Sequence, residues 1–581
     1  MGRKNCRKKE KIFLMTFTPE QLKTILLRII DKKPNTKIEL NFVRTKTAAE
    51  LHIFQPANRL LLSEYQKLTK SKEIPQLPWL EKLLKKADIR SISGISVVTS
   101  LVKPYTCPGK CVYCPTEVRM PKSYIATEPA AARALRLDFS PYEQVKQRVE
   151  MLEKNGHATD KIEYIIKGGT WNAYPLKYQY WFILESFRAC NDLSRRGKRR
   201  IPLLTEKNSL EELQDALEQE QRYNEHCKHR IIGLTLETRP DAITAKTIFH
   251  MRRQGCTRIE LGLQAPDDKI LDLIQRGHTV EQFEKAILLL RSAGFKVDLH
   301  FMPDLPGTTP DHDIEMYRLL FEKETLRPDM VKIYPNTVIK SAELYKWFQK
   351  GKYKPYGEKE LFRALSEMKM ITPRYCRISR LIRDIPETEI EAGNKITNLR
   401  EALSAELKKI GKQCVCLRCR EIGRQKENID ADTIPQLFID EYKTIGGTEY
   451  FLSFEDANRV AVFGFLRLRI PTKRSPDLTP SEEEKKYRTQ LSLLEKFLPE
   501  NKDCAFIREL HVYGKVVQIG KREKKDSQHK GLGKQLVAAA EKLCKEKGFK
   551  KVSVISGVGV RGYYRKLGYR KIGTYMVKKL K

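Results

Sequence analysis

The sequence lacks the features that would place a chain in a membrane or direct it out of the cell. No stretch approaches the roughly 18 uninterrupted apolar residues of a membrane-spanning helix. Residues 1–11 are basic and contain neither the apolar segment nor the small-residue cleavage site of a signal peptide. The 581 residues are 40% hydrophobic and 31% charged, which is typical of folded chains of about two to four domains. We therefore expect a cytoplasmic protein without a membrane partner.

Acidic residues are scarce relative to basic ones. The chain has 110 Lys and Arg but only 73 Asp and Glu, and the resulting net charge of +37 is spread along the whole length. A surplus of this size favours a polyanionic partner, with nucleic acid ahead of a membrane surface. It disfavours basic protein tails as partners, because like charges repel.

Residues 1–90 carry a large part of this charge, with 21 Lys and Arg against 9 Asp and Glu. Thr18-Pro19-Glu20 has the residue types of a helix start, and the apolar residues from Leu22 to Ile30 share one face of that helix. We expect a basic helical region that contacts the backbone of RNA. The alternative is that its Lys and Arg only form solvated helix faces.

The 13 cysteines show no pairing pattern that would indicate disulfides. Six of them fall in two tight clusters, and the other seven are scattered. In a large intracellular protein, clustered cysteines indicate metal binding.

The first cluster consists of Cys107, Cys111 and Cys114 at C-x-x-x-C-x-x-C spacing, beside a glycine and prolines that favour a tight loop. Three thiolates cannot ligate all four irons of a 4Fe-4S cluster, which leaves one iron open to bind S-adenosylmethionine (SAM). A structural zinc loop is the alternative, but it needs a fourth Cys or His, and none follows Cys114 closely. The segment resembles the signature of the radical SAM superfamily.

Short β-rich runs alternate with helical or linker stretches between residues 91 and 395. This alternation predicts a parallel sheet with right-handed crossovers, and six such units predict an open, partial barrel. The expected fold class is therefore α/β with a partial (βα)6 barrel, in which functional loops follow the carboxyl ends of the strands. The predicted strands are Ile95 to Thr99, Ile162 to Lys167, Ile231 to Leu236, Arg258 to Leu263, Lys296 to Phe301 and Met330 to Tyr334.

Glycine and polar residues follow or end several of these strands. Gly168 and Gly169 would let the backbone approach the amino group of SAM, and Arg239 offers a guanidinium to a carboxylate or a ribose. Gln264 ends the fourth strand and Lys332 lies in the sixth. Each has an ordinary alternative, such as a plain turn for the glycines or a surface ion pair for Arg239. Their convergence on one rim predicts a joint SAM site.

Cys414, Cys416 and Cys419 form the second cluster, in the basic segment 396–437. C-x-C-x-x-C spacing brings three soft thiolates within reach of one small ion, and redox-inert zinc suits a linker of this kind. The pattern does not identify a fourth ligand. Reduced cysteines without a metal, or a second iron-sulfur cluster, are the alternatives.

Residues 438–581 change to an antiparallel β pattern and contain no phosphate-binding Walker sequence. A Q-x-x-G-x-G turn opens an amphipathic helix there, and the free N–H groups of a helix start can hold a pyrophosphate. The pattern resembles the acetyl-CoA site of GNAT acetyltransferases, which have an α+β fold. Tyr563 and Tyr564 are candidates for a phenol near the thioester, or else for core aromatic residues. The candidate acetyl-CoA residues are Gln528, His529, Lys530, Gly531, Leu532, Gly533, Lys534 and Tyr564.

A radical SAM core followed by a GNAT module resembles the catalytic subunits of Elongator, the tRNA wobble-uridine modifying enzymes, in their archaeal form. The resemblance covers nearly the whole chain and adds His511 and Val512 to the expected acetyl-CoA site. The first cysteine gap is shorter than in eukaryotic members, although all three ligands remain. The segments that carry the resemblance are Cys107 to Pro115, Pro141 to Gln144, Glu163 to Thr170, Cys414 to Gly423, Arg508 to Gly514 and Gln528 to Gly533.

The resemblance implies a reaction that uses both modules. Acetyl-CoA held by residues 438–581 would extend into the radical domain, where a 5'-deoxyadenosyl radical removes a methyl hydrogen. The acetyl radical would add to C5 of the wobble uridine, and oxidation followed by thioester hydrolysis would leave 5-carboxymethyluridine on the tRNA. Lys332 would steer acetyl-CoA or the methionine carboxylate. Residues 1–90 and the radical domain would bind the tRNA anticodon stem-loop. The reaction would also require an electron donor. Two kinds of assembly stay open, a homodimer or a complex with Elongator-type partner subunits.

Two other functions are also open. A protein lysine acetyltransferase with a structural radical SAM domain would need a general base in the GNAT cleft, and the charge of +37 disfavours the basic tails that such enzymes acetylate. A noncatalytic tRNA-binding scaffold is the other alternative. The complete set of ligand cysteines and the intact pyrophosphate turn count against it.

Overall fold

The computed structural model describes residues 17–85, 93–195, 197, 202–425, 427–430, 432–472, 482–513 and 531–580. The chain divides into two units by its internal contacts, a smaller one of Met1–Ser91 and Glu150–Ala158, and a larger one of Ile92–Val149 and Thr159–Lys581. Every helix within the described residues is too short or too polar to span a bilayer.

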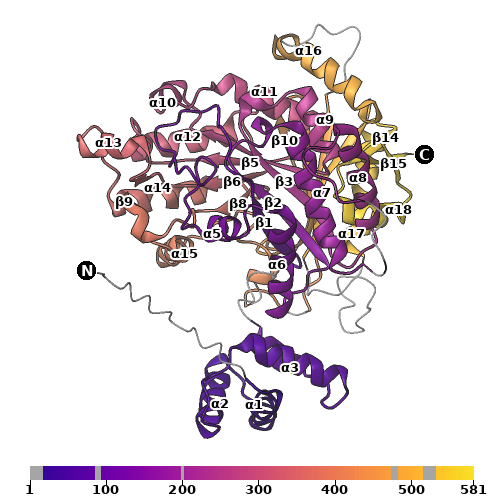
Figure 1. Cartoon of the computed structure of the whole chain (residues 1–581). Helices are drawn as coiled ribbons and strands as arrows, with labels where there is room; N and C mark the ends of the chain where they lie inside the picture. Colours follow the sequence, from indigo (N-terminus) through magenta and orange to yellow (C-terminus); the bar gives the residue numbers. More distant parts are fainter. Residues whose placement is uncertain are drawn as a thin grey trace, which may run out of the picture. The chain divides into compact units, whose positions relative to one another are not determined.

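The smaller unit contains four helices that share one apolar core (Figure 1). The first begins as predicted, because the Thr18 side chain accepts from Gln21 N while the Gln21 side chain accepts from Thr18 N. Leu22 and Ile25, on its predicted apolar face, are buried. The helices are α1 Pro19–Lys32, α2 Lys37–Glu50, α3 Asn58–Lys70 and α4 Pro78–Leu84.

In the larger unit, seven described strands form one parallel sheet in the order β1-β2-β3-β4-β5-β6-β8. The partial parallel barrel is confirmed, and each of the six predicted strands is present to within two residues at either end. The sequence pattern does not predict β8, because its four residues, R-I-S-R, contain only one apolar side chain. The strands are β1 Ser96–Leu101, β2 Lys161–Lys167, β3 Arg230–Thr238, β4 Arg258–Gln264, β5 Lys296–Phe301, β6 Met330–Ile333 and β8 Arg377–Arg380.

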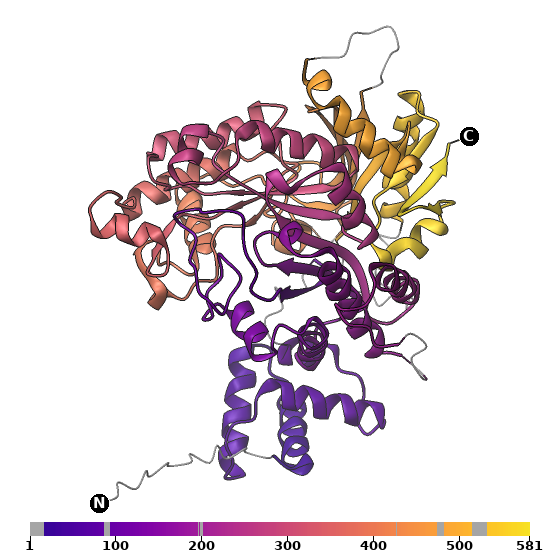
Figure 2. The same ribbon diagram turned by 45° about the horizontal axis from the view of Figure 1, so that its top comes forward.

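Helices connect the strands of this sheet and cover its outer face (Figure 2). Strand β2 illustrates why one face of the sheet is covered. Its residues Ile162, Tyr164 and Ile166 share one face and are buried, whereas the alternate residues are only partly buried. Two further short strands, β7 Thr337–Ile339 and β9 Ile390–Gly393, pair with each other. The helices are α5 Pro129–Arg136, α6 Pro141–Lys154, α7 Leu176–Asp192, α8 Leu210–Asn224, α9 Ala245–Arg253, α10 Asp268–Leu273, α11 Val280–Ser292, α12 Pro310–Glu322, α13 Glu343–Gln349, α14 Glu358–Ile371 and α15 Leu399–Lys409.

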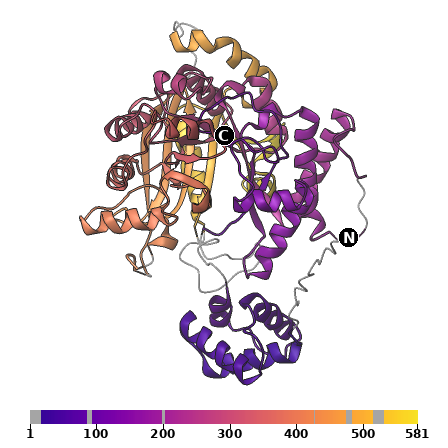
Figure 3. The same ribbon diagram turned by 60° about the vertical axis from the view of Figure 1, so that its left-hand side comes forward.

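A second sheet contains the strands of the C-terminal region, in the order β10-β11-β12-β13-β14-β16-β15 (Figure 3). All its neighbouring strands are antiparallel except β13 and β14, which are parallel. Strand β10 begins inside the segment expected to be a linker, and its mostly exposed side chains give a weak sequence signal. The elements are β10 Gln436–Thr444, β11 Gly447–Glu455, β12 Val462–Pro471, α16 Glu482–Phe497, β13 Ala505–Val512, α17 Leu532–Glu546, β14 Lys551–Val554, α18 Arg561–Arg565, β15 Arg570–Ile572 and β16 Tyr575–Lys579.

Buried ion pairs join the two sheets. Arg508 on β13 donates from NH1 to Asp329, just before β6, over 2.9 Å and to Glu449 on β11 over 2.8 Å. Arg291 on α11 donates to Glu449 over 2.8 Å, and these side chains are at most 1% exposed. Burial alone would raise the pKa of Asp329, but Arg508 and then Arg291 outweigh it and hold that pKa far below its ordinary value.

Backbone contact reinforces this junction. A Cβ on Gly557, in the C-terminal region, would lie only 1.8 Å from the carbonyl oxygen of Ile232 on β3. No side chain fits at that position, so glycine is required for the two backbones to meet. The radical-type sheet and the C-terminal sheet are therefore packed into one unit.

Candidate active site

The first cysteine cluster lies in the loop that follows β1. Cys111 is buried, and the other two cysteines are partly exposed. Val112 N donates to Ile274 O over 3.1 Å, and Leu344 N donates to Val112 O over 2.8 Å. The loop is thus fixed to segments that follow β4 and β6, so its position depends on strands far along the chain.

Hydrogen-bond donors lie beside two of the three sulfur atoms of this loop. Gly109 N donates to Cys107 Sγ over 3.4 Å, and Arg276 NH1 donates to Cys111 Sγ over 3.5 Å. The Cys114 thiol, and then the charge of Arg276, lower the pKa of Cys111 to about 4, although burial opposes the change. A metal cluster held by three thiolates carries negative charge on its sulfurs, so the donors present here fit such a group.

The glycine pair after β2 stands where side chains do not fit. The angle φ is +150° at Gly168 and +81° at Gly169, a region that favours glycine. A Cβ at Gly168 would lie 2.0 Å from Val102 Cγ2, and one at Gly169 would lie 3.3 Å from Lys122 O. Close packing against the segments that flank the cysteine loop explains both glycines. Their contact with the amino group of SAM stays a prediction.

Arg239, which follows β3, turns one N–H group toward the cysteine loop. Its side chain donates to the two carboxylate oxygens of Asp241, at 2.9 and 3.0 Å, and to Gly277 O at 3.2 Å. The remaining NH1 is buried, has no acceptor among the described residues, and lies 2.3 Å from the position of a Cβ on Gly109. An unpaired buried N–H is costly, so this geometry fits an acceptor supplied by a ligand.

Gln264 ends β4 in a strained conformation beside Arg276. Its φ of +80° is rare for a residue other than glycine, and its Oε1 is buried without a donor in the described part of the chain. Its Nε2 lies 2.8 Å from the position of a Cβ on Gly262, whose carbonyl oxygen accepts from Arg276 NH2 over 2.7 Å. Arg239 NH1, which borders the cysteine loop, and Gln264 Oε1, which lies beside Arg276, are thus two unpaired polar atoms at the strand ends.

Sequence reasoning missed Arg276, which follows the short helix α10 and not a strand end. Burial lowers the pKa of the neighbouring His278 to about 4, and the charge of Arg276 acts in the same direction. The imidazole is therefore neutral near pH 7, and its Nε2 accepts from Arg276 Nε over 3.1 Å while Nδ1 donates to Thr279 O over 3.2 Å. This contact aligns the guanidinium with Cys111. An arginine directly before a glycine and a histidine was the available signal, and it is a weak one.

Lys332 lies on β6 inside an ion-pair cluster of the half barrel. The residue is 4% exposed, and its ammonium pairs with Glu260, as does the ammonium of Lys167. Glu237, Glu260 and His300 place ligand atoms within 4.8 Å of one another, close enough for a metal ion. The two ammonium groups already neutralise Glu260 and would repel a cation. Lys332 is thus engaged with Glu260, and its action on acetyl-CoA or the methionine carboxylate stays a prediction.

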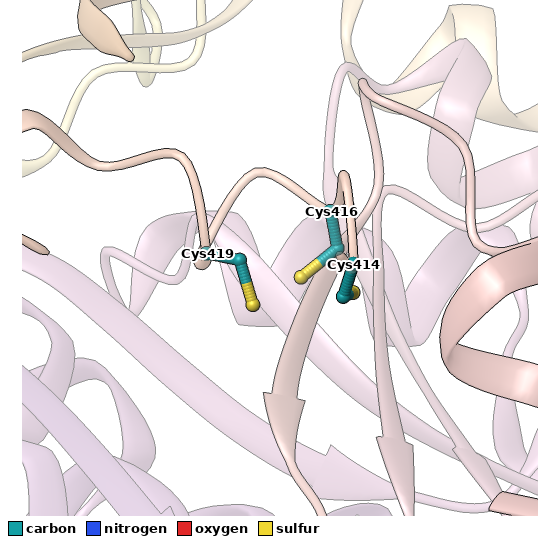
Figure 4. Close-up of side chains that lie close together, drawn as sticks. All are labelled: Cys414, Cys416 and Cys419. Carbon is teal, nitrogen blue, oxygen red and sulfur yellow. The ribbon is translucent and has the colours of Figure 1, made fainter. Parts of the chain in front are cut away.

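The second cysteine cluster is also formed. The sulfurs of Cys414, Cys416 and Cys419 lie within 4.8 Å of one another (Figure 4). Cys414 and Cys416 are buried, and Cys419 N donates to Cys416 O over 3.0 Å. Within the described residues, no fourth Cys, His, Asp or Glu completes this group. Three convergent soft sulfurs suit a zinc ion, and the identity of the ion stays a prediction.

The predicted acetyl-CoA turn is described from Gly531 onward, and Gln528, His529 and Lys530 lie outside the described residues. Gly531 has a φ of +102° and precedes α17, in which Leu532 is buried and Lys534 is exposed.

Gly533 lies in the first turn of α17. A Cβ on Gly533 would lie 2.8 Å from Tyr563 Oη and 3.5 Å from Val512 Cγ2, so the first turn of α17, the end of β13 and Tyr563 meet. His511, next to Val512, places its Nε2 at 3.1 Å from Ser93 O.

The two candidate tyrosines have different surroundings. Tyr563 is 37% exposed and borders Gly533, whereas Tyr564 is 5% exposed and belongs to the core of the C-terminal region. Their rings meet edge-on with centroids 5.4 Å apart, and burial raises the pKa of each phenol. Tyr563 is therefore the more accessible of the two and Tyr564 mainly fills the core, while a contact of either phenol with a thioester stays a prediction.

Three family models match the chain. They are the Radical SAM superfamily over residues 101–320, the Radical_SAM C-terminal domain over residues 328–409, and the Acetyltransferase (GNAT) domain over residues 524–579. The expected radical SAM and GNAT domains are thereby confirmed. A radical SAM domain implies a 4Fe-4S cluster and SAM, and a GNAT domain implies acetyl-CoA.

Relatives match over nearly the full length. The chain is 40% identical over 565 residues to the tRNA uridine(34) acetyltransferase of Methanocaldococcus jannaschii, with 95% of each chain covered. It is 35% identical over 562 residues to Elongator complex protein 3 of Homo sapiens, with 94% of each covered. Among solved structures, the archaeal Methanocaldococcus infernus Elp3 with an N-terminal deletion (1-46) gives a TM-score of 0.67 at 38% identity, covering 84% of this chain and 100% of that one. The chain therefore belongs to the family of the tRNA uridine(34) acetyltransferases and Elongator complex protein 3.

Proposed function

We propose that this enzyme modifies the wobble uridine of tRNA, using a SAM-derived radical and acetyl-CoA to form 5-carboxymethyluridine. The buried junction of Asp329, Glu449 and Arg508 carries the proposal, because it fixes the GNAT-type sheet against the radical-type sheet. A fixed arrangement of the two sheets suits a reaction in which the GNAT-type region holds the acetyl group and the radical-type region reacts with it. Relatives that are named for tRNA uridine(34) match both modules over 95% of this chain.

The residues of the cysteine loop and its rim bind and orient the radical source. Cys107, Cys111 and Cys114 would hold the 4Fe-4S cluster, which together with SAM supplies a 5'-deoxyadenosyl radical. Arg239 NH1 is a free donor suited to a carboxylate, and Gln264 Oε1 is a free acceptor suited to an amino or hydroxyl group. Gly168 and Gly169 keep the adjoining backbone close to the loop.

The C-terminal region holds the acetyl donor. The start of α17 offers N–H groups to the pyrophosphate of acetyl-CoA, and Tyr563 borders that turn. Lys332 is buried in the half barrel and pairs with Glu260, and its role would be to steer acetyl-CoA or the methionine carboxylate. The tRNA anticodon stem-loop and an external electron donor are the partners that this reaction needs.

A labelling experiment tests the proposal. Anaerobic protein, rebuilt with iron and sulfide, is incubated with tRNA, SAM, dithionite and acetyl-CoA labelled in its methyl group. We expect label in the RNA and formation of 5'-deoxyadenosine. Label found only in added protein would instead assign a lysine acetyltransferase, and tRNA binding without any turnover would assign a scaffold.

Substitutions of two separate cysteines, Cys111 and Cys227, provide a test variant and a matched control for this experiment. Cys111→Ser should abolish 5'-deoxyadenosine and leave tRNA binding nearly unchanged, because Cys111 lies in the radical loop. Cys227→Ser removes a partly exposed thiol that donates to His229 O, and it should retain turnover. Equal loss of tRNA binding and SAM cleavage in Cys111→Ser would show that the cysteines only maintain the fold.

A further inference from the structure

Two of the three arginines in the loop of the second cysteine cluster have carboxylate partners. Arg420 NH1 donates to Glu455 over 2.6 Å, and Arg424 Nε donates to Glu421 over 3.0 Å. Arg418, the third, forms no hydrogen bond or ion pair with any residue that the structure describes, and its Nε is buried without an acceptor. Carboxylates of the protein thus neutralise the charges of Arg420 and Arg424, whereas the charge of Arg418 has no such partner among the described residues.

Further guanidinium groups lie near enough to Arg418 to act on its charge. They belong to Arg377, Arg400 and Arg424, and together with Arg418 they form the arginine cluster. The carboxylate nearby, Glu421, already pairs with both Arg377 and Arg424. Arg400 NH1 is a second buried N–H without an acceptor in the described part of the chain. The cluster therefore lacks negative charge on the side of Arg418.

The cysteine sulfurs offset the charge of two members of the cluster, Arg377 through Cys416 and Arg400 through Cys416 and Cys419. Arg400 NH2 also donates to Ile378 O over 3.1 Å. Arg418 lies between these cysteines in sequence and is partly exposed. Its Nε is buried, so an anion from solution would approach the terminal NH1 and NH2 groups.

We propose that the arginine cluster binds a backbone phosphate of the RNA substrate, with Arg418 as the residue that contacts the phosphate oxygens and Arg400 as an added positive charge beside it. A planar guanidinium with free N–H groups matches the oxygens of a phosphate, and a partly buried one is unfavourable until an anion pairs with it. The net charge of +37 favours RNA as the source of that phosphate. The proposal rests on the proposed function for the identity of the substrate.

The salt dependence of tRNA binding measures this contact. Each phosphate neutralised by a protein cation contributes about 0.7 to 0.9 to the slope of log K against log salt concentration. With full-length protein and tRNA, Arg418→Gln should reduce the slope by about this amount and weaken binding about tenfold at low salt. Arg400→Gln, on α15 and before the three cysteines in the sequence, should also reduce the slope.

Two further variants separate the phosphate contact from net charge. Arg418→Lys keeps the charge but not the planar group, so it should restore the slope and only part of the affinity. Lys542→Gln also removes one charge, on α17, where the Lys542 side chain is 81% exposed, and it should leave the slope unchanged. Metal content and unfolding midpoint should be equal in all variants, which excludes loss of the fold.

Coenzyme A also carries phosphate groups, so its binding is measured in parallel. Acetyl-CoA should bind Arg418→Gln and the unaltered protein equally, and a tenfold loss would assign the cluster to coenzyme A and overturn the proposal. An unchanged salt slope in both Arg418→Gln and Arg400→Gln would also overturn it, while leaving the proposed function intact. Absence of tRNA binding by the unaltered protein would contradict the proposed function itself, and this proposal with it.

Discussion

The Arg276 guanidinium donates from NH1 to the sulfur of Cys111 over 3.5 Å. A cationic donor stabilises the reduced form of a cluster bound through that sulfur, because reduction adds negative charge. Arg276→Gln should therefore lower the reduction potential of the rebuilt cluster. A tenfold decrease in the equilibrium constant for reduction of the cluster corresponds to a decrease of about 59 mV in the potential of a one-electron couple.

A redox titration followed by electron paramagnetic resonance measures that potential. Arg363→Gln is the control, since Arg363 is half-exposed and pairs with the exposed carboxylate of Asp311. Equal potentials in Arg276→Gln and the control would show that Arg276 does not act on the cluster.

Gly533→Ala should weaken acetyl-CoA binding. The added Cβ would meet Tyr563 Oη at 2.8 Å and displace the phenol from the first turn of α17. We expect an increase of about tenfold in Kd, or about 1.4 kcal/mol, by calorimetry. Gly562→Ala is the matched control, because its added Cβ would have no atom within 4 Å. If both variants bound acetyl-CoA like the unaltered protein, Tyr563 would have no part in shaping that site.

Asp329→Asn should destabilise the junction of the two sheets. Asp329 pairs with Arg508 and lies near Arg291, and all three side chains are fully buried. Removing one partner of a buried ion pair costs about 3–5 kcal/mol, because the remaining charges lose their compensation. Urea unfolding should show this loss. Asp311→Asn is the control, because Asp311 is exposed, and it should leave the urea midpoint unchanged. If Asp329→Asn unfolded at the same midpoint as the unaltered protein, the role given to the junction would be contradicted.

Asp304 and Asp313 form a buried carboxyl pair after β5. Asp304 N donates to Asp313 Oδ2 over 2.6 Å, and Tyr356 OH donates to the same oxygen over 2.9 Å. Burial raises the pKa of Asp304 to about 8 and the pKa of Asp313 to about 7. Folded-state pKa values above the ordinary value mean that the folded protein binds these protons more tightly than the unfolded chain does.

The contribution of this pair to stability is therefore complete below about pH 4 and is lost as the pH rises through about 7 to 8. Asp313→Asn keeps an acceptor for Tyr356 and removes the titrating group. Its unfolding midpoint should fall less between about pH 5 and pH 8 than that of the unaltered protein. Parallel pH profiles for the two proteins would refute this assignment.

Local patterns in the sequence were sufficient for much of the fold. The strands β2 and β5 have enough apolar residues to be recognised, and the spacing of Cys107, Cys111 and Cys114 identifies the radical loop. Strand β8 was not predictable, because R-I-S-R becomes a strand only through pairing with β6.

The charged parts of the site were harder to predict, because their partners are distant in sequence. Arg276 meets Cys111 across 165 residues, and Arg508 meets Asp329 across 179. A buried arginine and an exposed one have the same letter in a sequence, and only the fold decides which carboxylate or thiol it faces. Lys332 illustrates the same point, since its partner, Glu260, lies two strands away in the sheet.

The hydrogen that the SAM-derived radical removes should come from the methyl group of acetyl-CoA. Acetyl-CoA with a fully deuterated methyl group, incubated with the rebuilt protein, SAM, dithionite and tRNA, tests this by mass spectrometry of the nucleosides. We predict one deuterium in 5'-deoxyadenosine and two in the carboxymethyl group on the wobble uridine. Deuterium-free 5'-deoxyadenosine, together with RNA that carries either all three deuterium atoms or none, would contradict the account.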